Sequence, residues 1–216
     1  MWVDLDSPAE EIVAEAVRVI RSGGIVFYPS DTIYGLGCDP FDDEALKRLY
    51  RLKGRNEGKG VLLLVPNREW VRRLVADVPL VADRLMDSLW PGPLTLLLPA
   101  SRQVPSGLCG KEGKIGVRCP DSKFLQEWMN SLCGPVVSTS ANLSGQGVPN
   151  NLEALRDLFL NRVDLFLEAG ELAGYPPSTV LDLVGRPKVV RRGARVKQVT
   201  EILDSLSGGN DKRIGT

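Results

Sequence analysis

The most informative absence in this 216-residue chain is histidine, which does not occur at all. Without histidine the chain cannot form a Ser-His-Asp triad, a Cys-His pair or a His-ligated metal site. Four cysteines stand at positions 38, 109, 119 and 133, with no CxxC pair among them. We expect them to be free thiols at buried or half-buried positions, because no partner base for a catalytic cysteine is visible. Any enzyme built on this chain is therefore expected to work by positioning and electrostatics.

Long apolar runs and an excess of one charge are also missing. No segment approaches the ~20 apolar residues that span a bilayer, and the acidic residues 1–11 do not resemble a signal peptide. Lys+Arg is 27 and Asp+Glu is 27, which excludes a uniformly basic nucleic-acid coat. With 43% hydrophobic residues, we expect one cytoplasmic domain over residues 1–206 and no membrane partner. The polar, Gly-rich segment 207–216 is expected to be a disordered tail.

Patterns typical of helices and strands intermix along the chain. Ser7, Pro8 and Glu10 predict a capping box at the start of a first helix, which Gly23 and Gly24 end. Further helices are expected at 42–52, 68–76, 79–89, 122–132 and 151–160. Strands are expected at 25–28, 61–65, 94–98, 115–118, 136–139, 165–168, 179–184 and 189–191. Many strands are continuous apolar runs, which indicates cover on both faces and predicts a layered α/β domain with a mixed sheet.

The balanced total charge hides two basic segments. Residues 47–59 hold six basic residues against one acidic residue, and residues 186–197 hold six basic residues and no acidic one. A solvated helix face and a protected edge strand explain several of them. That explanation suits Lys53 and Arg55 less well, because they stand in a Gly-rich loop before a buried strand. Such a loop can bend around a polyanion, with arginine as a fork-shaped donor.

Two polar loops each follow an expected strand. Residues 138–145 offer four hydroxyl groups and one amide, and residues 29–37 form a second polar loop. Ligands in open α/β sheets gather beyond the ends of strands, but ordinary turn chemistry explains Ser and Asn equally well. No Walker A loop or Rossmann fingerprint is present. The loops alone therefore leave a ligand site and plain turns as open alternatives.

Taken together, the loops resemble those of the YrdC/Sua5/TsaC family. The matching motifs are YPSDTIYGL at 28–36, KGR at 53–55, IGVRCP at 115–120, STSANLSG at 138–145, PSTVLD at 177–182 and VRRGA at 190–194. They occur in order and extend the resemblance over about residues 8–197. The KxR and SxN elements occur together, which resembles the single-domain synthases more than the YciO-like members.

The resemblance implies a three-layer α/β fold with a twisted mixed sheet around a central cavity. It also implies an L-threonylcarbamoyladenylate synthase, a nucleotidyltransferase that converts L-threonine, bicarbonate and ATP into threonylcarbamoyl-AMP and pyrophosphate. Mg²⁺ would accompany the ATP. The product would serve t6A modification at position 37 of tRNAs that read ANN codons, through a separate Kae1/TsaD-type transferase. Such a reaction needs aligned ligands and fixed charges but no protein nucleophile, which agrees with the missing histidine.

The resemblance also implies roles for single residues. Those implied to bind L-threonine are Thr32, Arg118, Ser138 and Ser178. Those implied to bind ATP are Lys53, Arg55, Lys59, Ser140, Asn142, Val148 and Arg192. Lys53 and Arg55 are the implied catalytic residues, because fixed cations stabilise charge that develops on the leaving pyrophosphate. Ser140 and Asn142 are also the candidate protein contacts of Mg²⁺.

Two departures and two alternatives accompany this resemblance. Leu64 stands where many relatives have histidine, and Asn56 where they often have proline. Only 19 residues follow Lys197, so the second domain of the longer Sua5 type is not expected. One alternative is a double-stranded RNA or tRNA-binding module that uses the basic segments as a phosphate track, without synthase activity. The other, a carbamoyl-transfer enzyme of hydrogenase maturation, needs additional domains for which this chain has no room.

Overall fold

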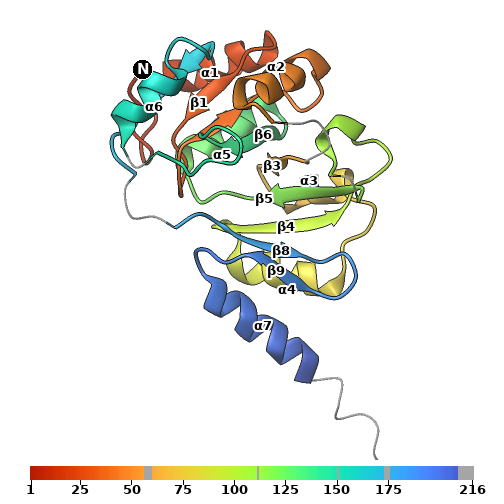
Figure 1. The fold of residues 1–216 in the computed structure, drawn as a ribbon. Helices are drawn as coiled ribbons and strands as arrows, with labels where there is room; N and C mark the ends of the chain where they lie inside the picture. The colour runs from red at the N-terminus through yellow and green to blue at the C-terminus, as the bar shows by residue number, and fades with distance from the viewer. Residues whose placement is uncertain (56–59, 111, 150, 173–175, 209–216) are drawn as a thin grey trace, which may run out of the picture.

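The computed structural model describes residues 1–55, 60–110, 112–149, 151–172 and 176–208. Within these residues nine strands form one mixed sheet, in the order β7-β1-β2-β6-β3-β5-β4-β8-β9. Figure 1 shows helices α1, α2, α5 and α6 gathered around the β1 end of this sheet, and α4 and α7 together near the β9 end. The structure therefore confirms the mixed α/β fold expected from the sequence.

The strands are short, and several were expected to within two residues at either end. Their bounds are β1 (Val26–Tyr28), β2 (Gly35–Gly37), β3 (Leu62–Leu64), β4 (Leu94–Pro99), β5 (Lys114–Arg118), β6 (Val136–Ser140), β7 (Leu165–Phe166), β8 (Thr179–Asp182) and β9 (Lys188–Arg191). Three pairs are parallel, namely β1 with β7, β3 with β5 and β4 with β8. The remaining neighbours run antiparallel, so the sheet is mixed along its whole width.

The helices carry one apolar face each and pack on the sheet through it. Their bounds are α1 (Glu10–Arg21), α2 (Asp43–Lys53), α3 (Arg68–Leu74), α4 (Leu80–Leu89), α5 (Lys123–Leu132), α6 (Leu152–Phe159) and α7 (Val196–Gly208), with a 3₁₀ turn η1 at Ser106–Leu108. Asp42 begins α2 by accepting the backbone N–H groups of Glu44 and Ala45. Gly54, with φ +59°, ends it.

Two hydrophobic cores lie on the two faces of the sheet. Phe27 belongs to the core that α2, α3, α4 and α6 cover, whereas its neighbours Val26 and Tyr28 belong to the core that α1 and α5 cover. Successive side chains of a strand point to opposite faces, so β1 contributes to both cores. Helices therefore cover both faces of the sheet, which gives the three layers.

Four features differ from the expectations. Helix α1 begins at Glu10 with Ala9 as N-cap, because Asp4 accepts the backbone N–H of Ser7 in a local turn and Ser7 caps nothing. Residues 35–37 form strand β2 and are not part of a loop, and residues 196–208 form α7, for which no pattern was recognised. Cys133 is exposed, because it ends α5 in the left-handed conformation with φ +55°.

None of the helices in the described parts of the chain has the length and apolar character needed to cross a membrane. The described part of the expected tail belongs to α7, which runs to Gly208. Residues 209–216 lie outside the described residues.

Candidate active site

A cavity of about 530 Å³ lies between the β1–β2 loop, residues of strands β3, β4, β5 and β6, and the beginning of β8. Six of the residues singled out from the sequence line it: Thr32, Arg55, Arg118, Ser138, Ser140 and Ser178. Three of them are almost completely buried, since Thr32, Arg118 and Ser178 expose only 3–4% of their surface. These residues are far apart in the sequence, and the mixed sheet brings them together.

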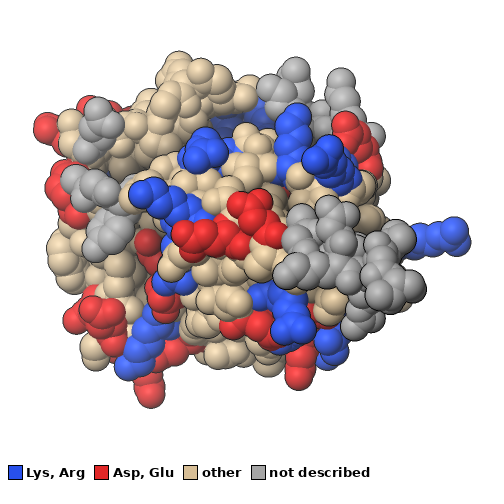
Figure 2. Space-filling model, turned by 90° about the horizontal axis from the view of Figure 1, so that it is seen from below, with Lys and Arg blue, Asp and Glu red and all other residues tan. Residues whose placement is uncertain are grey.

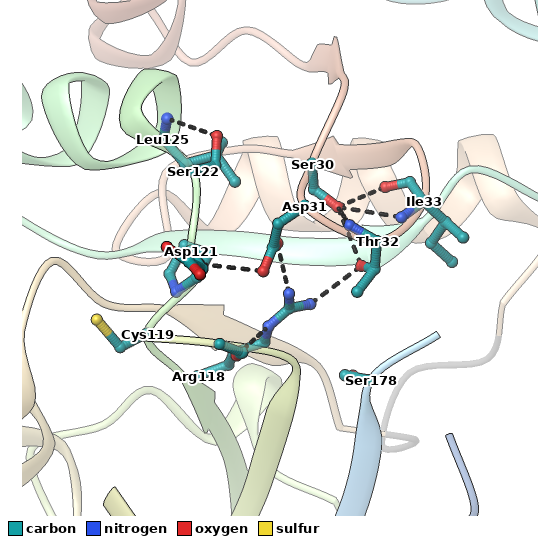
Figure 3. Close-up of polar contacts among 12 residues, drawn as sticks. Ser30, Asp31, Thr32, Ile33, Arg118, Cys119, Asp121, Ser122, Leu125 and Ser178 are labelled. Carbon is teal, nitrogen blue, oxygen red and sulfur yellow. Dashed lines mark hydrogen bonds and ion pairs between the residues drawn. The ribbon is translucent and has the colours of Figure 1, made fainter. Parts of the chain in front are cut away.

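Arg118, the last residue of β5, is fixed by three acceptors. Its Nε donates to Gly92 O (3.1 Å), its Nη1 to Thr32 Oγ1 (3.2 Å), and its Nη2 to Asp31 Oδ1. Figure 3 shows the guanidinium reaching from β5 towards Asp31 and Thr32 in the β1–β2 loop. A guanidinium has five N–H groups, so these contacts with described residues leave two for a ligand in the cavity.

The β1–β2 loop is held in shape by the buried Ser30. Its hydroxyl donates to Ile33 O (2.6 Å) and lies 3.1 Å from Thr32 Oγ1. Ser30 Oγ also accepts the backbone N–H groups of Thr32 and Ile33 (3.2 Å each). Arg118 occupies one lone pair of Thr32 Oγ1. Because a hydroxyl has two lone pairs and one proton, Thr32 Oγ1 can still form a hydrogen bond with a ligand group such as an amine or a hydroxyl.

Tyr28 forms another part of the cavity wall, and the sequence reasoning did not single it out. Its hydroxyl donates to Ser138 Oγ (2.6 Å), and burial raises the pKa of this phenol. The ring lies against β2, where a Cβ on Gly35 would stand 2.9 Å from Tyr28 Cζ. The close approach of the ring therefore favours glycine at this position of β2, and a glycine inside a strand often marks such an approach.

Ser178 precedes β8 and is linked to two further residues that the sequence reasoning missed. Its Oγ lies 2.9 Å from Thr95 Oγ1 and accepts a hydrogen bond from Arg191 Nη2 (2.9 Å). Arg191 Nε also donates to Ser178 O (3.0 Å). Burial and, after it, the charge of Arg118 lower the pKa of Arg191, because the two guanidinium groups share this part of the cavity. The motif at 190–194 could have indicated Arg191, but the resemblance pointed to Arg192.

Lys53 is the last residue of α2 and is only 2% exposed. Its Nζ donates to Ser140 O and to Asn142 Oδ1 (3.0 Å), while Ser140 Oγ donates to the same Asn142 oxygen (2.6 Å). Burial and then the nearby charge of Arg55 lower the pKa of Lys53 to about 7. Lys53 therefore supports the end of β6 and the turn that follows it, and Ser140, the last residue of β6, lines the cavity.

Two cationic residues stand at the outer part of the cavity. Arg55 Nη2 donates to Gly60 O (2.6 Å), and both residues line the cavity. Lys114, at the start of β5, forms ion pairs with Asp182 (2.6 Å) and Glu112. This part of the cavity is more exposed than the part around Arg118.

The structure places the other residues singled out from the sequence outside the wall of the cavity. The described residues that line the cavity do not include Lys53, Asn142, Val148 or Arg192. Lys53 and Asn142 are one layer behind Ser140, and Arg192 is an exposed neighbour of the lining residue Arg191. Lys59 lies outside the described residues. Contacts of these residues with ATP stay predictions.

The described residues around the cavity offer few side-chain ligands for a metal ion. Within the described chain no three Cys, Asp or Glu side chains gather in a way that could hold a metal ion. The Asn142 oxygen already accepts from the Lys53 ammonium group and from Ser140. Mg²⁺ in nucleotide sites is bound mainly by phosphates and water, with one or two protein oxygens. Of the two candidate contacts Ser140 and Asn142, Ser140 is the one among the described residues that line the cavity, so its Oγ fits this description better.

Basic and acidic side chains alternate on the surface, and several of them form ion pairs. Figure 2 shows Lys and Arg interspersed with Asp and Glu on the face seen from below. On α2, Lys47 pairs with Glu44 (2.8 Å) and Arg48 with Asp164 (2.9 Å), so part of the first basic segment is neutralised locally. A continuous phosphate track would need unpaired cations in a row.

Comparisons with known proteins identify the family. The Sua5/YciO/YrdC family model, described as "Telomere recombination", matches residues 18–193. A threonylcarbamoyl-AMP synthase of Pseudomonas fluorescens is 37% identical over 180 residues, which are 83% of this chain and 96% of that protein. A crystal structure of Pyrococcus abyssi Sua5 complexed with L-threonine is 29% identical, with a TM-score of 0.86 over 94% of this chain and 61% of that one.

Another solved relative, E. coli YciO, is 32% identical with a TM-score of 0.82, over 90% of this chain and 95% of that one. The chain belongs to the Sua5/YciO/YrdC family, as the sequence motifs predicted. The similarity to curated threonylcarbamoyl-AMP synthases at 30–37% identity over most of the chain supports the predicted enzyme class.

Proposed function

We propose that this chain makes threonylcarbamoyl-AMP from L-threonine, bicarbonate and ATP in the cavity around Arg118, with release of pyrophosphate. The observation that carries the proposal is a buried guanidinium that three protein acceptors fix and whose contacts leave two N–H groups for a ligand, beside the buried hydroxyl of Thr32. This pair of groups suits an α-amino acid, because Arg118 can bind its carboxylate and Thr32 its amine.

The reaction needs two bond-forming steps. The threonine amine attacks the carbon of bicarbonate, an N–C bond forms, and water leaves. An oxygen of the resulting carbamate then attacks the α-phosphorus of ATP, and the bond to pyrophosphate breaks. No protein nucleophile takes part, so the protein contributes alignment and charge. The relatives named threonylcarbamoyl-AMP synthase support this chemistry.

The outer part of the cavity suits the triphosphate. Arg55 lines it, and Ser140 adds a hydroxyl at the end of β6, which Lys53 supports. In the proposal Arg55 stabilises the charge that develops on pyrophosphate, and Mg²⁺ arrives with ATP and neutralises part of the phosphate charge. Lys53 fixes the loop and adds positive charge when it is protonated.

The product is a reactive mixed anhydride that another enzyme must consume. In the proposal a Kae1/TsaD-type transferase moves the threonylcarbamoyl group to tRNAs that read ANN codons, in the cytoplasm. Binding of tRNA or double-stranded RNA by this chain itself would be a secondary property, because several cations of α2 are paired with acidic residues.

A pyrophosphate-release assay with single omissions tests the proposal. Pyrophosphate should form from ATP only when L-threonine and bicarbonate are both present, and degassed buffer should remove the activity. The adenylate should be identified by mass in the complete reaction. Equal pyrophosphate release without threonine would contradict the synthase function, and tight, salt-sensitive RNA binding without turnover would favour the RNA-binding alternative.

A further inference from the structure

The carboxylate of Asp31 joins three parts of the candidate active site. Its Oδ1 accepts from Arg118 Nη2, and its Oδ2 accepts from the backbone N–H of Asp121 (3.0 Å). The side chains of Asp31 and Arg118 are only 9% and 5% exposed. Figure 3 shows the side chain of Asp31 extending from the β1–β2 loop towards Arg118 and towards Asp121 in the segment that follows β5. Asp31 therefore fixes the guanidinium relative to both loops.

Asp31 balances the charge of the arginine that is buried at the cavity. Arg118 and Arg191 both line the inner part of the cavity, where Ser178 accepts from Arg191 Nη2 (2.9 Å). Arg191 is exposed, whereas Arg118 is buried and pairs with Asp31. Because a buried charge needs a partner, Asp31 both stabilises the guanidinium of Arg118 and orients it.

Elsewhere in the chain a second pair has the same chemistry. Asp164 accepts from Arg48 Nη2 (2.9 Å) and from the backbone N–H of Ile25 (2.7 Å). Its side chain and that of Arg48 are 39% and 42% exposed, and neither lines the cavity around Arg118. Asp164 is therefore a matched control for changes at Asp31.

We infer that Asp31 is a positioning residue that orients Arg118. The oriented guanidinium would hold the carboxylate of L-threonine so that its amine faces the carbon of bicarbonate. The inference rests on the proposed function. Asp31 does not touch the substrate in this scheme, and its effect is transmitted through the guanidinium.

Asp31→Asn should separate binding from turnover. The amide can accept from Arg118 or from the Asp121 N–H but not from both, because its second atom is a donor. The freed positive charge still attracts a carboxylate, so the Kd for L-threonine should change by less than about 5-fold. The carboxylate would lose its fixed orientation, and misplacement by about 1 Å costs about 100-fold in rate. We expect kcat to fall about 30- to 100-fold, and Asp164→Asn to leave kcat within about 2-fold.

A binding measurement tests the orientation of the bound amino acid without turnover. Calorimetry with L- and D-threonine should give a clear preference of the wild-type chain for the L form, because two fixed contacts define the position of the side chain. In Asp31→Asn this preference should fall towards equal affinities. Asp31→Glu keeps the charge but moves the carboxylate, so it should fold like the wild type and still lose at least about 10-fold in kcat.

The outcomes are distinguishable. An unchanged kcat together with an unchanged L-to-D ratio in Asp31→Asn would overturn the inference, even if its melting temperature falls. Full activity of Asp31→Glu would also overturn it, because charge alone would then suffice. A wild-type chain that binds L-threonine but shows no threonine-dependent pyrophosphate release overturns the proposed reaction only. If Asp31→Asn does not fold, the kcat and L-to-D ratio of Asp31→Glu decide the matter.

Discussion

The pairs Asp31–Arg118 and Asp164–Arg48 have the same chemistry and different surroundings. Each joins a carboxylate to one arginine and one backbone N–H. The first pair is buried at the cavity, whereas the second is about 40% exposed. An exposed pair contributes about 0–1 kcal/mol, but a buried pair that loses one partner leaves an uncompensated charge, at a cost of about 3–5 kcal/mol. Both arginines are paired, but only Arg118 is buried at the cavity. Burial therefore distinguishes the arginine that is suited to bind a ligand.

Replacing the buried arginine should give the largest effect. Arg118→Lys keeps the charge, but an ammonium group cannot hold Gly92, Thr32 and Asp31 and still present two N–H groups to a ligand. We expect kcat/KM for L-threonine to fall about 1,000-fold in the pyrophosphate assay. The matched change Arg48→Lys should stay within about 2-fold. A loss below about 5-fold in Arg118→Lys would contradict the importance of the fork geometry.

Arg55, in the outer part of the cavity, can also be compared with the surface residue Arg48. Arg55→Ala should lower kcat about 30- to 150-fold, since the charge-assisted contact with phosphate is worth roughly 2–3 kcal/mol at the transition state. Arg55→Lys should restore part of this rate. Arg48→Ala should lower the free energy of unfolding by about 1 kcal/mol or less and leave kcat unchanged.

RNA affinity of the same two alanine variants tests the alternative function. If the basic segment were a phosphate track, Arg48→Ala and Arg55→Ala would each weaken RNA binding slightly and reduce its salt dependence alike. Equal behaviour of both variants in turnover and in RNA binding would contradict the catalytic role of Arg55.

Much of the fold could be predicted because its elements carry local signals. Asp42 with the apolar stripe of α2, and the continuous apolar run of β3, indicated their elements from neighbouring residues alone. Strand β2 gave no such signal, because Gly35 and Gly37 have low strand propensity and are needed for the approach of the Tyr28 ring and the β6 backbone. The N-terminus of α1 was misplaced because Asp4 competes for the backbone of Ser7.

The sequence motifs predicted several of the residues that line the cavity, but not the contacts that depend on tertiary packing. Thr32, Arg118 and Ser178 were indicated by their motifs and meet in one cavity. Asp31 stands inside the same motif as Thr32, yet its partner on Asp121 depends on how two distant loops pack. Lys53 was expected in a loop, but it is the last residue of α2 and points into the protein. Side-chain direction at the end of a helix is decided by tertiary packing, which the sequence pattern does not contain.

The buried Lys53 and the exposed Lys47 allow a further comparison between buried and exposed cations. The expected effect is smaller and concerns how the free energy of unfolding depends on pH. Its pKa is about 7 in the folded chain, because burial and Arg55 disfavour the charged form, against an ordinary value of 10.5. Between these pH values the unfolded chain binds more protons than the folded chain, so the contribution of Lys53 to stability rises with pH. Exposed Lys47, on the same helix and paired with Glu44, serves as the control.

Urea unfolding of the wild type, Lys53→Met and Lys47→Met at pH 7, 8, 9 and 10 measures this effect. The difference in unfolding free energy between wild type and Lys53→Met should increase with pH, by at most about 1.4 kcal/mol per pH unit. The difference between wild type and Lys47→Met should change far less with pH, because Lys47 is exposed and lacks the burial that acts on Lys53. A flat difference for Lys53→Met would mean that Lys53 keeps its proton in the folded chain. Its ammonium group would then act on the Ser140 loop as a permanent charge.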